Sequence, residues 1–122
     1  MPDWIGVDLD GTLARNDVEG WLENIGPPVE RMIVRVRNWL AQGRDVRIMT
    51  ARVSSRNSTG FDAQKQRALI ERWCVEHIGT LLPVTSEKDH MMVQLWDDRA
   101  ICVQENTGRY VCFKDDGEIK HR

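Results

Sequence analysis

Short apolar runs alternate with stretches of helical periodicity along most of this chain, and that alternation constrains its fold more than any other feature. Four runs are typical of buried strands, namely residues 4–7, 45–49, 81–84 and 93–96. Two stretches between them, residues 27–42 and 61–77, place apolar side chains at helical spacing. Strands that alternate with helices favour a mainly parallel sheet with helices on both faces. We therefore expect an α/β fold, specifically a Rossmann-like three-layer α/β/α sandwich.

The last part of the chain predicts further β-structure. Residues 101–103 form an expected fifth strand, and residues 110–113 with Ile119 predict a short hairpin around Asp115-Asp116-Gly117. The sequence contains no internal repeat, linker or low-complexity segment. At 122 residues the chain is long enough to bury a genuine core, so we expect a single domain over residues 1–122.

Composition excludes some classes of partner. The net charge is −2, which gives no general attraction for nucleic acid or for anionic membranes. No segment resembles a signal peptide or a membrane span. The three cysteines, Cys74, Cys102 and Cys112, are widely spaced in apolar surroundings, which predicts buried reduced thiols. These features indicate a cytoplasmic protein.

Polar side chains follow the apolar runs at four places. In chain order these segments are Asp8-Leu9-Asp10-Gly11-Thr12, Thr50-Ala51-Arg52, Lys88 and Asp97-Asp98. In parallel sheets, ligands bind beyond the carboxyl ends of the strands. The sequence therefore predicts one site with carboxylates, a hydroxyl and a cation, where phosphate and a divalent metal can be held together.

The spacing of the first segment suggests a reaction. Asp8 and Asp10 are two residues apart, so in an extended chain both carboxylates can face one site. One carboxylate can attack phosphorus, while the other protonates the leaving oxygen and then activates water. Gly11 permits a sharp turn that brings a backbone amide close to a bound anion. Crowded carboxylates require a hard cation, for which Asp97 and Asp98 supply further oxygen ligands.

These residues resemble the motifs of the haloacid dehalogenase superfamily of phosphohydrolases and phosphotransferases. Residues 8–12 are similar to its first motif, Thr50 to the second, Lys88 to the third and Asp97-Asp98 to the fourth. The resemblance implies Asp8 as nucleophile and Asp10 as general acid and base, with Lys88 completing the catalytic set. It also implies Mg²⁺ bound by the Asp8 carboxylate, the Asp10 backbone carbonyl and Asp97, with Asp98 as a further ligand or a supporting partner. The expected phosphate- and substrate-binding residues are Leu9, Gly11, Thr50, Ala51 and Arg52.

The sequence leaves two possible roles open for several of these residues. Lys65, in the second predicted helix, competes with Lys88 for the role of motif lysine. Arg52 could bind the leaving group or be solvated. Trp21 follows the first strand, where it could pack or meet substrate. The segments at residues 14–26 and 53–60 are too short for the cap domain found in many relatives, so we expect an open, capless site that a second copy of the chain could close.

The leading hypothesis is a magnesium-dependent phosphatase that cleaves a small phosphomonoester through an aspartyl-phosphate. An alternative is a phosphatase for nucleotides or nucleic-acid ends, although the chain has no basic face. An alternative of another class is a non-catalytic module that binds a phosphorylated metabolite or a protein. Hydrolysis and phosphoryl transfer share the same intermediate, so the residues do not separate them.

Overall fold

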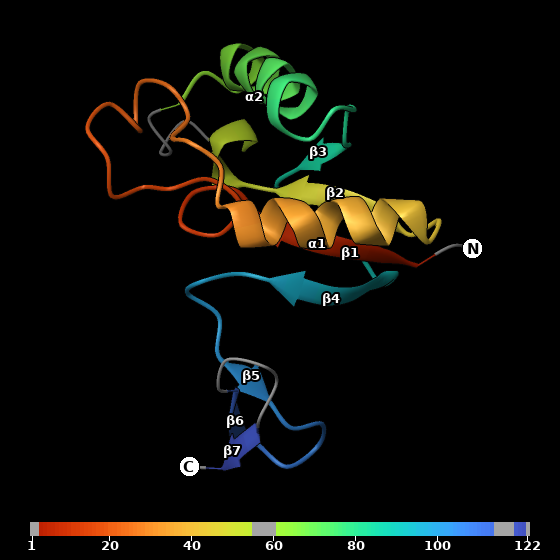
Figure 1. Cartoon of the computed structure of the whole chain (residues 1–122). Coiled ribbons are helices and arrows are strands. Elements are labelled where there is room, and N and C mark those ends of the chain that lie inside the picture. Colours follow the sequence, from red (N-terminus) through yellow and green to blue (C-terminus); the bar gives the residue numbers. More distant parts are fainter. Residues whose placement is uncertain (1–2, 55–60, 114–118, 122) are drawn as a thin grey trace.

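The computed structural model describes residues 3–54, 61–113 and 119–121 of this chain. Its larger sheet contains four parallel strands in the order β3-β2-β1-β4 (Figure 1). The strands are β1 (Trp4–Asp8), β2 (Asp45–Met49), β3 (Val84–Thr85) and β4 (Met92–Trp96). The mixed α/β class and the parallel sheet predicted from the alternating pattern are therefore confirmed.

The core lies around β1 and β2. Residues 4–7 of β1 are all buried, which explains why this strand is a continuous apolar run. In β2 only Val46 and Ile48 are fully buried, so its sequence alternates between apolar and polar residues. The buried cluster continues through Ile33 and Val36 of the first helix and Ile70 of the second.

Two α-helices occur in the described part of the chain, α1 (Glu30–Ala41) and α2 (Ala63–His77). Helix α1 runs along the strands of the larger sheet, and α2 lies towards its β3 side (Figure 1). The Asp62 carboxylate caps α2 by accepting hydrogen bonds from the backbone N–H groups of Gln64 and Lys65. A short 3₁₀ helix, η1 (Ala51–Val53), directly follows β2. Because α1 and α2 are the only α-helices among the described residues, the three-layer sandwich stays a prediction.

The connection order places a switch point beside β1. From β1 the chain passes through α1 to β2 and through α2 to β3, all on one side of β1, whereas β4 pairs with its other side. Open α/β sheets bind ligands in the crevice beyond the strand ends where the strand order reverses. The carboxyl ends of β1 and β4 flank that position in this sheet.

Two sequence predictions, the strand at residues 81–84 and the burial of Cys102, need correction. The predicted strand at residues 81–84 is wrong over its first part, since β3 comprises only Val84–Thr85. Pro83 has no N–H for a ladder and contributes only its carbonyl, which accepts a hydrogen bond from Ile48. The predicted fifth strand is confirmed as β5 (Cys102–Val103), which belongs to a second, antiparallel sheet. The thiol of Cys102 is exposed, whereas Cys74 is buried as expected.

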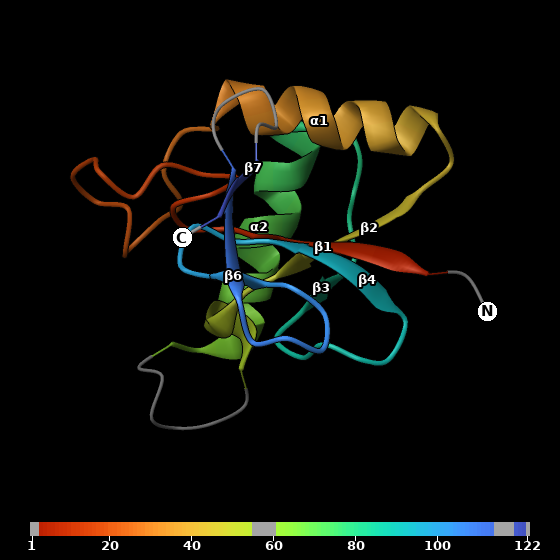
Figure 2. The ribbon, with the colours of Figure 1, turned by 90° about the horizontal axis from the view of Figure 1, so that it is seen from below.

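The second sheet has the order β5-β6-β7, with β6 (Tyr110–Phe113) antiparallel to β7 (Ile119–His121). The predicted hairpin pairing is thus confirmed, and its turn at Asp115-Asp116-Gly117 lies outside the described residues. Figure 2 views the molecule from below the view of Figure 1, with this small sheet in front of the larger one. In the described residues, no helix is long and apolar enough to cross a membrane.

Candidate functional site

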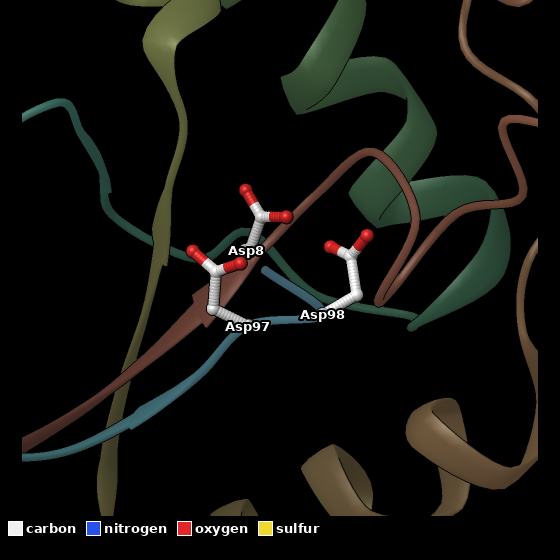
Figure 3. A group of neighbouring side chains, drawn as sticks. All are labelled: Asp8, Asp97 and Asp98. Atoms are coloured by element: carbon white, nitrogen blue, oxygen red, sulfur yellow. The ribbon is translucent and has the colours of Figure 1, made fainter. Parts of the chain in front are cut away.

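Three carboxylates meet at the carboxyl ends of β1 and β4. Asp8 is the last residue of β1, and Asp97 and Asp98 directly follow β4. One carboxylate oxygen from each lies within 4.8 Å of the others. Figure 3 shows the three side chains rising from these two neighbouring strand ends. The sequence-predicted residues Asp8, Asp97 and Asp98 are therefore brought together at the switch point of the sheet.

The carboxylates of the cluster repel one another. The pKa of Asp8 is raised from 3.8 to about 7, mainly by burial and then by the charge of Asp97, with a hydrogen bond and the charge of Asp98 adding to the effect. A hydrogen bond from the Leu9 backbone opposes this shift in pKa. The three carboxylates have no ion-pair partner among the described residues, so together they suit a hard divalent cation, which prefers carboxylate ligands.

The turn after β1 is built against Asp98. Gly11 has a φ of +92°, and a Cβ atom at this position would lie 2.6 Å from Asp98 Oδ2. Only glycine therefore allows both the backbone conformation and the close approach. Thr12 Oγ1 donates a hydrogen bond to Asp98 Oδ1 at 3.1 Å and accepts one from the Asp98 backbone N–H at 3.0 Å. The turn and the segment after β4 are thus joined directly.

Asp10 lies in a different environment from Asp8. Its two carboxylate oxygens accept hydrogen bonds from Arg52, with Nε to Oδ2 at 2.7 Å and Nη2 to Oδ1 at 2.9 Å. The Arg52 side chain is 1% exposed and that of Asp10 is 19% exposed. Arg52 also donates to Gln66 Oε1 at 2.8 Å and to the Trp21 carbonyl at 2.6 Å. Arg52 is therefore not the solvated residue that one interpretation of the sequence expected.

The predicted phosphate-binding residues have mixed positions. Thr50 is buried, and its hydroxyl accepts a hydrogen bond from the Arg52 backbone N–H at 3.2 Å, which caps η1. Ala51 is exposed at the start of η1, whereas Leu9 belongs to the buried core. The described contacts occupy four of the five N–H donors of Arg52. Its expected contact with phosphate stays a prediction.

Neither of the two lysines that the sequence suggests for the catalytic set makes a contact with the cluster of Asp8, Asp97 and Asp98 among the described residues. Lys88 is exposed in the loop between β3 and β4, and Lys65 is exposed in the first turn of α2. No hydrogen bond or ion pair joins either ammonium group to a described residue. The two candidates for this role therefore remain.

The partnership of Asp10 with Arg52, and the contributions of Gln66 and Thr12, were missed from the sequence. A signal for the first of these exists in the strand register. Asp8 pairs with Met49 across parallel strands, so Asp10 and Ala51 each lie two positions beyond this last pair. That register brings Asp10 near Arg52 although 42 positions separate them.

Comparison with known proteins identifies no relative. No family model, no curated protein and no solved structure matches this chain. Functional inference therefore depends on the residues and geometry described above.

Proposed function

We propose that this protein is a magnesium-dependent phosphohydrolase of the haloacid dehalogenase type, cleaving a small phosphomonoester through an aspartyl-phosphate. The observation that carries the proposal is the meeting of Asp8, Asp97 and Asp98 at the switch point of the sheet, with Asp10 two residues beyond Asp8. The motif resemblance supports the same roles. A capless three-layer fold with an open site belongs to this proposal.

In the proposed mechanism, an oxygen of the ionised Asp8 carboxylate attacks phosphorus. The bond from phosphorus to the ester oxygen breaks, and Asp10, which first takes up a proton from solvent because its resting carboxylate is the anionic partner of Arg52, gives that proton to the departing oxygen, which leaves as an alcohol. Asp10, now ionised, takes a proton from water as that water attacks phosphorus. The bond from phosphorus to Asp8 then breaks, which releases inorganic phosphate and restores the Asp8 carboxylate and the Asp10 proton.

The oxygen donors fit Mg²⁺, and the residues that would hold it are Asp8, Asp97 and Asp98, together with the Asp10 backbone carbonyl. A bound Mg²⁺ neutralises charge on the phosphoryl oxygens and on the nucleophile. Lys88 supplies a second positive charge in this proposal, and the Thr50 hydroxyl donates to a phosphate oxygen. The Gly11 and Thr50 backbone N–H groups do not take this role, because they already donate to the carbonyls of Ala14 and Thr85, each at 2.8 Å. The buried thiol of Cys74 is compatible with a cytoplasmic location, which we also propose.

The test is phosphate release from a panel of sugar phosphates, nucleotides and aryl phosphates, with Mg²⁺ or with a chelator. We expect magnesium-dependent release that falls about a thousandfold or more in Asp8→Asn. Asp45→Asn is the matched control, because Asp45 begins β2 at the opposite end of the sheet.

A radiolabelled ester adds a second readout that separates the alternatives. Label trapped on Asp8 in the wild type and absent in Asp8→Asn supports the covalent intermediate. Label that is trapped but released only to an added alcohol indicates phosphoryl transfer instead of hydrolysis. No release and no trapped label, while Mg²⁺ is bound, would contradict the enzymatic proposal and favour a binding module.

A further inference from the structure

Arg52 is the only arginine of those described that is fully buried, and it reaches three separate parts of the site. It contacts Asp10 beyond β1, Gln66 in α2, and the backbone carbonyl of Trp21 in the loop before α1. The rings of Trp21 and Phe61 lie 5.9 and 5.2 Å from its guanidinium carbon. These contacts fix the guanidinium plane in one orientation.

That fixed plane determines how the Asp10 carboxylate is held. Both Asp10 oxygens accept from adjacent N–H groups of one guanidinium, a two-pronged geometry that aligns the two planar groups. A carboxylate has about four lone-pair sites, so two remain for other partners. The Asp10 side chain keeps 19% of its surface exposed, which leaves it reachable from the open side.

We infer that Arg52 is a positioning residue for Asp10: it orients the carboxyl group so that an oxygen position not occupied by Arg52 carries the proton and faces the leaving-group oxygen of the substrate. This inference rests on the proposed function, in which Asp10 transfers the proton. A lysine would not replace it, because a single ammonium group cannot hold both carboxylate oxygens in one plane. Gln66 acts one step further away, since it holds Arg52 at Nη1.

The chemistry of the leaving group provides a test that folding defects do not mimic. An alkyl oxygen needs a proton as it departs, whereas a nitrophenolate departs readily without one. A poorly aimed Asp10 therefore slows cleavage of alkyl phosphates more than cleavage of 4-nitrophenyl phosphate. A smaller folded fraction lowers both rates equally.

The experiment compares kcat/KM for 4-nitrophenyl phosphate and for the best alkyl phosphate of the panel in the wild type, Arg52→Lys and Asp10→Asn. We expect Arg52→Lys to lose about 10- to 100-fold more activity on the alkyl ester than on the nitrophenyl ester. Adding Arg52→Lys to Asp10→Asn should cause little further selective loss, because both changes remove the same function. Arg47→Lys is the matched control, since Arg47 makes a similar two-pronged pair with Asp45 at the other end of β2.

Gln66→Met provides a second variant that leaves Arg52 and Asp10 in place, and it should show a smaller selective loss in the same direction. If Arg52→Lys does not fold, the selective loss of Gln66→Met on the alkyl ester tests the positioning role instead. Equal losses on both esters in an active protein would overturn the positioning role alone. A wild type that cleaves neither ester with Mg²⁺ present would overturn the proposed function and the positioning role together.

Discussion

Asp8 and Asp10 are two residues apart and lie in opposite electrostatic environments. Asp8 faces Asp97 and Asp98, and its pKa is raised to about 7. Asp10 is held by the buried guanidinium of Arg52 through two hydrogen bonds. One carboxylate thus lacks a positive partner among the described residues, and the other has one built into the fold.

The difference shows that one motif can serve two purposes through its surroundings. A carboxylate crowded by others is suited to bind a cation, because the cation relieves repulsion that the fold has already introduced. A carboxylate fixed by a buried arginine is suited to a role that requires a defined orientation. The contrast predicts that removing the two charges has opposite effects on stability.

The largest expected effect concerns Asp8 in the metal-free protein. Its folded pKa is about 7 against an ordinary value of 3.8, so between these pH values the folded state keeps a proton that the unfolded state has lost. Stability from this group is therefore lost as the pH rises through that window. Asp8→Asn removes the loss, so the variant should be more stable than the wild type at pH 8.

Urea unfolding with a chelator at pH 4, 6 and 8 measures this difference between the wild type and Asp8→Asn. Asp17→Asn is the control, because Asp17 is exposed and its pKa is lowered, chiefly by the hydrogen bond from Arg15. A difference between the wild type and Asp8→Asn that stays constant from pH 4 to pH 8 would contradict the prediction.

Asp10→Asn should act in the opposite direction. The change leaves the buried Arg52 charge without its anionic partner, which we expect to lower the free energy of unfolding by about 3 kcal/mol. Asp45→Asn is the matched control, because Asp45 and Arg47 form a similar pair in which each side chain is 30% exposed. The control should cost less than about 1 kcal/mol. Equal losses of unfolding free energy in Asp10→Asn and Asp45→Asn would show that the burial of Arg52 does not strengthen its pair with Asp10.

The sequence predicted those parts of the fold that depend on local pattern. The bounds of β2 and the start of β1 follow from apolar runs, and the end of α2 at His77 follows from helical spacing, whereas the cap at Asp62 was not predicted. The predicted strand at residues 81–84 was mostly wrong, because apolar composition alone does not show that the ladder begins only after Pro83. The strand ends were sufficient to predict that Asp8, Asp97 and Asp98 lie together. The Asp10 and Arg52 pair depends on register between distant strands, which composition and periodicity do not contain.

Magnesium should stabilise the folded protein by binding to the cluster of Asp8, Asp97 and Asp98. At a hundredfold excess over its dissociation constant, a ligand of the folded state adds about 2.7 kcal/mol. We expect thermal unfolding at pH 7.5 to shift upward with Mg²⁺ in the wild type, and the shift to be lost in Asp97→Asn. Asp10→Asn should keep the shift, because the Asp10 carboxylate is not one of the three clustered groups. A full shift in Asp97→Asn would place the cation elsewhere.

The smallest expected effect tests how the turn after β1 supports the cluster. Thr12→Val keeps the side-chain shape but removes both hydrogen bonds to Asp98, at 3.1 and 3.0 Å. We expect a loss of about 1 kcal/mol in unfolding free energy, together with a several-fold weaker Mg²⁺ affinity, because Asp98 is no longer held against Gly11. Thr85→Val is the matched control, since the Thr85 hydroxyl makes two similar hydrogen bonds with the Glu87 backbone. Calorimetric titration with Mg²⁺ should show weaker binding in Thr12→Val and unchanged binding in Thr85→Val. Equal affinities in the two variants would mean that Asp98 keeps its place near Asp8 without Thr12.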